Sequence, residues 1–220
     1  MLPEYLFQRL KAVFFDAEGT LFQIKPSVGY IYSRVCAEFG LRVSPEEMET
    51  QFREVFDQER HRYPMTPEGC YQEWKNIFLK TVEKWGTLSD PDEAFSRCYQ
   101  AFAQREFFEL SPGAKEALSL LKEAGLKLAI VSNWDERLRS LVRAFGLEPF
   151  FEELFISCEI GLAKPDPTLY RVACHRLGVL PQETLMIGDH PEDDVLAARQ
   201  AGLWALRYPG GDLRRLFPLK

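Results

Sequence analysis

Acidic side chains directly follow two strand-like runs of this chain. Asp16 and Glu18 come after the run Ala12–Phe15, and Asp189 comes after the run Thr184–Ile187. A carboxylate can attack phosphorus to form an aspartyl-phosphate, transfer protons, or bind a hard cation. Acids in these positions therefore predict either a reactive or cation-binding site, or simply polar turns that end two strands.

Two other positions carry polar groups that complement these acids. Ser132 and Asn133 end a third strand-like run, and Lys164 lies in a later loop. A hydroxyl can bind a phosphoryl oxygen, and a lysine ammonium is a compact charge that would steady an attacking carboxylate and the transferring group. Asp16, Asp189 and a phosphate dianion would repel one another, so the chemistry needs a further cation. Oxygen ligands and a phosphate substrate favour Mg²⁺ in that role.

The elements that must position these residues alternate along the chain after about residue 108. Short apolar runs bounded by turn residues predict strands, and capped amphipathic stretches predict helices. The expected strands are 12–15, 127–131, 153–157, 184–187 and 203–206, and the expected helices are 111–124, 135–145, about 167–177 and 191–201. This alternation is typical of an α/β fold with a doubly wound parallel sheet. The polar residues that end its strands would then lie along one edge.

Between the first strand and this alternating region lies a stretch with helical periodicity throughout. Ser44-Pro45 and Thr66-Pro67 are typical helix starts, with a capping side chain before proline. We expect helices at 27–39, 44–61, about 66–82 and from 89 onward. The predicted organisation is an α/β core of residues 1–22 and 108–220, with an all-helical cap inserted at 23–107.

Composition narrows the class of protein and of partner. The chain has 220 residues, is 46% hydrophobic and 27% charged, and carries a net charge of −6. An acidic chain has no electrostatic footprint for nucleic acid or for an anionic membrane. Its five scattered cysteines, without a C-x-x-C pair, fit reduced thiols better than disulfides or zinc. We therefore expect a cytoplasmic protein with a small-molecule partner, and the oligomeric state is open.

Four short motifs occur in order along nearly the whole chain. They read F-D-A-E-G-T-L from Phe15, V-S-N from Val131, G-L-A-K-P-D from Gly161 and I-G-D-H-P-E-D-D from Ile187. With this order and spacing the sequence resembles the haloacid dehalogenase-like hydrolase superfamily. The helical insertion after the first motif is similar to that family's α-helical cap of the first type. The resemblance implies a Rossmann-like core and a Mg²⁺-dependent phosphatase acting on a small phosphorylated metabolite.

The resemblance also implies a role for each motif residue. Asp16 would be the nucleophile, and Asp16, Asp189 and the backbone carbonyl of Glu18 would be metal ligands. Asp194 would hold a metal-bound water, and Asp193, which stands where many relatives carry Asn, could share that role. The remaining residues would bind the phosphoryl group or the nucleophile: Ser132, Asn133 and Lys164.

Glu18 departs from the pattern of the family's phosphatases, which usually have Asp there as the general acid and base. Glu carries the same carboxyl on a longer stem, and a misplacement of about 1 Å can cost on the order of 10²-fold in rate. Two alternatives therefore stay open. One is a 2-haloacid dehalogenase-type hydrolase, although those relatives lack a carboxylate at this position and need no metal. The other is a catalytically weak binding or scaffold protein.

Overall fold

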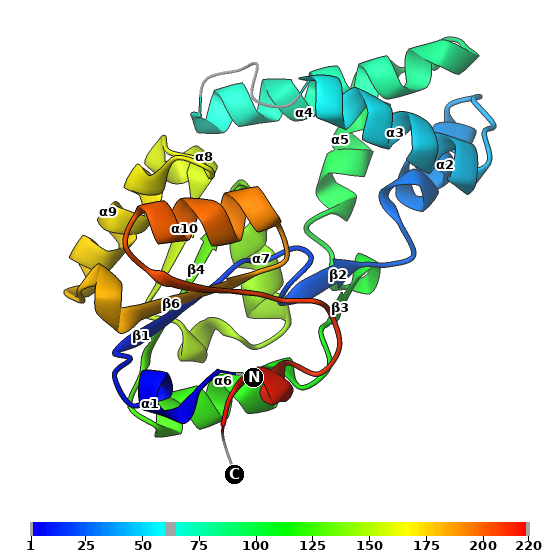
Figure 1. Cartoon of the computed structure of the whole chain (residues 1–220). Coiled ribbons are helices and arrows are strands. Elements are labelled where there is room, and N and C mark those ends of the chain that lie inside the picture. The colour runs from blue at the N-terminus through cyan, green and yellow to red at the C-terminus, as the bar shows by residue number, and fades with distance from the viewer. Residues whose placement is uncertain (1, 60–64, 219–220) are drawn as a thin grey trace. The chain divides into compact units, whose positions relative to one another are not determined.

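The protein, described by a computed structural model over residues 2–59 and 65–218, divides into two compact units. One unit comprises Met1–Gln23 and Leu110–Lys220, and the other comprises Ile24–Glu109. Figure 1 shows the elements of both in chain order.

A parallel five-stranded sheet forms the centre of the first unit, as the alternating sequence predicted. Its spatial order is β5 (Glu153–Ile156), β4 (Lys127–Ser132), β1 (Ala12–Phe15), β6 (Thr184–Gly188) and β7 (Trp204–Arg207). The central strand β1 is fully buried, because it has neighbours on both edges and helices over both faces. Phe15 pairs with Ile130 of β4 and Ile187 of β6, so the three strands end at nearly the same level.

Helices cover both faces of this sheet. Phe14 and Met186 pack against Tyr170 of α9 (Pro167–Leu177) and Ala198 of α10 (Ala197–Gln200) in one buried cluster. On the other side lie α6 (Ala114–Glu123) and α7 (Arg137–Ala144) (Figure 1). Each has two fully buried leucines, Leu118 and Leu121 in α6 and Leu138 and Leu141 in α7. The shorter elements of the unit are α1 (Glu4–Phe7), α8 (Ser157–Ile160), and single turns at Glu148–Phe150, Pro181–Glu183 and Leu213–Leu216.

The expected helix 191–201 differs from the structure in its first half. Pro191–Leu196 is a π-helical turn, and only Ala197–Gln200 is α-helical. The backbone carbonyl of His190 accepts hydrogen bonds from the N–H groups of both Asp194 and Val195, at 3.1 and 3.4 Å. Such a wide turn is a common device at functional sites because it redirects a side chain.

The second unit is helical, with α2 (Val28–Glu38), α3 (Pro45–Glu59), α4 (Pro67–Val82), α5 (Pro91–Ala101) and single turns at Glu83–Trp85 and Arg105–Phe107. Each capping residue that the sequence indicated accepts a backbone hydrogen bond, for example Thr66 from Gly69 at 3.0 Å. Edge-to-face contacts join Tyr32 to Phe78 and Phe52 in its core. The last two residues of the helix expected at 44–61 lie outside the described residues.

The chain passes between the two units through β2 (Phe22–Ile24) and β3 (Phe108–Leu110), which form a two-stranded sheet. Neither strand was expected, since three residues are too few to display an alternating pattern.

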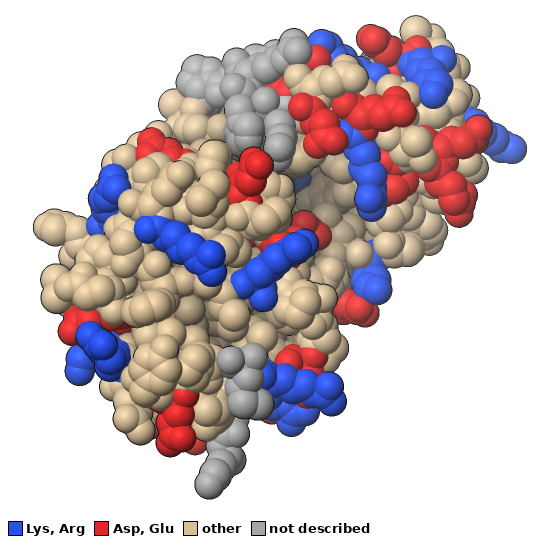
Figure 2. Space-filling view, in the orientation of Figure 1, with Lys and Arg blue, Asp and Glu red and all other residues tan. Residues whose placement is uncertain are grey.

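Lys and Arg side chains lie singly or in small groups among Asp and Glu on the face in Figure 2. Within the described ranges, no helix is both long and apolar enough to cross a bilayer.

Candidate active site

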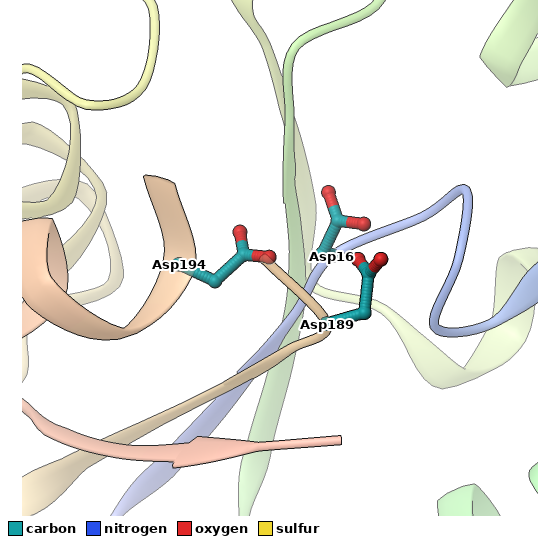
Figure 3. Close-up of side chains that lie close together, drawn as sticks. All are labelled: Asp16, Asp189 and Asp194. Atoms are coloured by element: carbon teal, nitrogen blue, oxygen red, sulfur yellow. The ribbon is translucent and has the colours of Figure 1, made fainter. Parts of the chain in front are cut away.

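Three carboxylates meet at the carboxyl edge of the sheet. Asp16 follows β1, Asp189 follows β6, and Asp194 belongs to the π-helical turn after it. One oxygen from each lies within 4.8 Å of the others. Figure 3 shows all three carboxyl groups gathered around one point. Asp16 and Asp194 are buried, and Asp189 is half-buried. The acids are distant in sequence but lie close together, as the positions of Asp16 and Asp189 at strand ends predicted.

Lys164 is the cation of this site. Its ammonium donates hydrogen bonds to Oδ1 of Asp16 at 2.5 Å and to Oδ1 of Asp194 at 2.6 Å. The side chain is only 4% exposed, so both ion pairs are shielded from water. Asn133 fixes the backbone that carries it: Nδ2 donates to the Lys164 carbonyl, and Oδ1 accepts from the Lys164 N–H, both at 2.8 Å.

Ser132 brings the remaining predicted hydroxyl to the nucleophile candidate. Its Oγ donates to Oδ1 of Asp16 at 3.2 Å, and the residue is 2% exposed. A single carboxylate oxygen of Asp16 therefore accepts from both Ser132 and Lys164.

The position of Asp194 depends on close contacts around it. Its Oδ2 accepts a hydrogen bond from the His190 N–H at 2.9 Å. Gly188 must lack a side chain, because a Cβ there would overlap the Asp194 carboxyl group. The neighbouring Asp193 is not part of the carboxylate cluster found among the described residues. Its backbone carbonyl instead accepts from the phenol of the buried Tyr170 at 2.7 Å.

Burial dominates the electrostatics of the site. It raises the pKa of Asp16 to about 7, with Lys164 opposing the rise and Asp194 adding to it by repulsion. Burial also raises the pKa of Asp189, and repulsion from Asp194 adds to that rise. Burial alone would lower the pKa of Lys164, but attraction to Asp16 and Asp194 raises it above its usual range. The ammonium of Lys164 therefore stays charged, and this one positive charge does not balance the three clustered carboxyl groups when all of them are ionised.

Glu18 lies apart from the three clustered carboxyl groups. Its side chain is exposed and, together with Asp189, lines a pocket in the same unit. Directly after Glu18 the backbone passes through Gly19 at φ +85°. A Cβ on Gly19 would lie 2.6 Å from the Asp189 carboxyl. Glycine is thus needed here both for its conformation and for space.

Two features of the site were missed by sequence reasoning. Tyr170 supports the acidic turn, and the buried pair Asp135–Arg137 follows the Ser132-Asn133 motif, with Arg137 donating to Asp135 at 2.6 and 2.8 Å. A tyrosine on the apolar stripe of a helix signals a hydroxyl that needs a buried partner. That signal was present for Tyr170, but the partner lies 23 residues away. No sequence pattern marked Asp135 as buried.

Comparison with known proteins gives consistent matches over most of the chain. A family model for haloacid dehalogenase-like hydrolases matches residues 10–202. The chain is 30% identical to haloacid dehalogenase-like hydrolase domain-containing protein 3 of Xenopus laevis, over 88% of this chain and 82% of that protein. It is 37% identical to a phosphoserine phosphatase of Thermus thermophilus, over 60% of this chain and 53% of that enzyme.

A solved structure is similar over nearly the whole chain. The crystal structure of a dehalogenase superposes with a TM-score of 0.69 at 26% identity, covering 96% of this chain and 91% of that one. The relatives and structural neighbours thus include proteins named for phosphoryl chemistry and for carbon–halogen chemistry.

Proposed function

Because the chain belongs to the haloacid dehalogenase-like hydrolase family, we propose that it is a Mg²⁺-dependent phosphatase acting on a small phosphorylated metabolite. The observation that carries this proposal is the group of three carboxylates within 4.8 Å, with one buried ammonium on two of them. The relative named phosphoserine phosphatase gives independent support. We further propose that the inserted helical unit is a cap that selects the substrate, as mobile lids do.

The donor set fits a magnesium ion. It offers only carboxylate oxygens, which Mg²⁺ prefers to nitrogen or sulfur, and its acids outnumber its one ammonium. Asp16, Asp189 and the backbone carbonyl of Glu18 would hold the ion, and Asp194 would hold a water bound to it. When bound, the ion would offset the repulsion between these acids and a phosphate dianion.

The chain's own residues then divide the reaction among them. The Asp16 carboxylate attacks phosphorus and the alcohol leaves, so that an aspartyl-phosphate forms and water later hydrolyses it. Ser132 and Lys164, which both donate hydrogen bonds to Asp16, are proposed to bind phosphoryl oxygens as negative charge develops on them. Asn133 uses one amide N–H to hold Lys164, and its second N–H is proposed to bind substrate.

Glu18 is proposed to protonate the leaving alcohol and then to activate the water. Its carboxyl is exposed beside Asp189, on the pocket side of the site. Glu18→Gln should slow turnover at least about tenfold, the lower part of what acid–base help contributes, while Glu18→Asp should keep or raise the rate. Equal rates for wild type and Glu18→Gln would refute this role.

The proposal as a whole is tested with purified protein, Mg²⁺ and p-nitrophenyl phosphate. We expect turnover that is abolished by EDTA and by Asp16→Asn. Asp57→Asn, which removes the same charge from an exposed position on α3, is the matched control and should behave as wild type. Chloride release from a 2-haloacid without added metal would favour the dehalogenase alternative, which the similar dehalogenase structure supports. The absence of turnover over a broad panel of phosphate esters would favour a scaffold.

A further inference from the structure

A pocket of about 540 Å³ opens beside the candidate active site, within the first unit alone. Glu18 and Asp189 form its wall nearest the site, and the segment 207–211, which begins at the last residue of β7, forms another wall. Nothing in the proposed catalytic steps uses this second wall.

The segment 207–211 is firmly held, so the wall exists before any ligand arrives. The Tyr208 N–H donates to the carbonyl of Gly188 at 2.7 Å, which ties it to the end of β6. Its hydroxyl donates to the Gly211 carbonyl at 2.5 Å, and its ring is buried. Gly210 and Gly211 have φ values of +86° and +91°, and a Cβ on either would meet no atom within 4 Å. The positive φ values therefore favour glycine at both positions, and the space beside them is open.

Arg207 is the basic residue of this pocket among the described residues that line it. Its Nε donates to the backbone carbonyl of Asp189 at 3.0 Å, which anchors the guanidinium next to a proposed metal ligand. The side chain is exposed and lines the pocket, and this hydrogen bond uses only one of its three nitrogens. An anchored guanidinium presents a planar pair of donors that matches the oxygens of a carboxylate or a phosphate.

We propose that this pocket receives the alcohol part of the phosphate ester, and that Arg207 binds a second oxyanion on it. The inference rests on the proposed phosphatase function and narrows the substrate class to esters with an additional carboxylate or phosphate. Glu18 supports this direction, since the residue proposed to protonate the leaving oxygen lines the same pocket. Substrate choice is then made in part by the α/β unit itself.

Binding of non-hydrolysable phosphonates tests the pocket without requiring turnover. The probes are carboxyethylphosphonate and propylenebisphosphonate, which each carry two anionic groups. Propylphosphonate, which carries only the phosphonate group, is the control. The dissociation constant of each is measured by calorimetry with Mg²⁺. We expect at least one probe with two anionic groups to have a dissociation constant about tenfold lower than that of propylphosphonate, or lower still. This is the range for a charge-assisted hydrogen bond. The probe with the stronger preference tells whether the second oxyanion is a carboxylate or a phosphate.

Arg207→Met should abolish this preference. Arg199→Met is the matched control, because Arg199 is also exposed and donates to one backbone carbonyl, that of Ala205 at 3.2 Å. The control should keep the preference. A wild type that binds all probes equally, or binds none, overturns the proposal, as does a preference that survives in Arg207→Met.

Turnover of p-nitrophenyl phosphate separates this proposal from the function on which it rests. A binding preference that depends on Arg207, in a protein without turnover, supports the pocket and refutes the phosphatase. Turnover without any preference among the phosphonates supports the phosphatase and refutes the pocket.

Discussion

Replacing Lys164 by methionine isolates the charge that joins two buried acids. The ammonium lies 2.5 Å from Asp16 and 2.6 Å from Asp194, and Met fills a similar volume without any charge. Removing one partner of a buried ion pair typically costs about 3–5 kcal/mol, because the other charge is left buried. We therefore expect Lys164→Met to lower the free energy of unfolding by about that amount at pH 8.

The penalty should depend on pH in a direction that the pKa of Asp16 fixes. In the folded protein this pKa is raised to about 7 by burial, and Lys164 is the group that opposes the rise. An acid with a raised folded pKa reduces stability as pH increases between its unfolded and folded pKa values. Loss of Lys164 moves the folded pKa higher still, and each further unit adds about 1.4 kcal/mol to the penalty at alkaline pH. The penalty should therefore be smaller at pH 5, where Asp16 is protonated in both proteins.

Urea unfolding in EDTA at pH 5, 6, 7 and 8 measures this dependence. Hydrogen exchange read on peptides from β1 and β4 reports on the first unit alone, so the helical unit does not contribute to the signal. Lys115→Met, at an exposed position on α6, is the control and should change stability little at any pH. A Lys164→Met penalty that is absent, or equal at pH 5 and pH 8, would refute the reasoning.

Two further substitutions test other parts of the site, and a labelling experiment tests the core of the helical unit. Gly188→Ala should displace the Asp194 carboxyl by overlap, costing about 1–3 kcal/mol of stability in urea unfolding and most of the aryl-phosphate turnover. Asp135→Ala removes the partner of the buried Arg137 and should lower the free energy of unfolding by about 3 kcal/mol, whereas Asp135→Leu with Arg137→Met should cost less. Burial raises the pKa of Cys36 to about 12, so iodoacetamide at pH 8 should label it only after unfolding, as peptide mass spectrometry would record.

The sheet and the placement of its acids could be predicted because they depend on local patterns. Ala12–Phe15 and Thr184–Ile187 are apolar enough to read as buried strands, and each is followed at once by an acid. Parallel strands end at a common edge, so Asp16 and Asp189 had to approach one another. The structure places them in one cluster.

The finer arrangement depends on contacts between distant parts of the chain, which no local pattern encodes. The run Pro191–Leu196 has ordinary helix-forming composition, yet it widens into a π-helical turn around the His190 carbonyl. The hydrogen bonds from Asn133 to the backbone of Lys164 arise only when residues 31 positions apart meet, so the sequence did not reveal them. The roles proposed for the site residues remain predictions: Asp16, Glu18, Ser132, Asn133, Lys164, Asp189 and Asp194.

The two hydrogen bonds between the Asn133 amide and the backbone of residue 164 make this residue suitable for side-chain replacement. The amide holds the main chain at that residue through two hydrogen bonds that do not depend on the Lys164 side chain. Exchanging lysine for arginine, ornithine or an uncharged analogue should therefore alter the chemistry without shifting the loop. In contrast, Asn133→Ala should loosen the backbone at residue 164 and leave the ammonium itself unchanged. Replacement of Lys164 and replacement of Asn133 therefore separate the effect of the charge from the effect of its position.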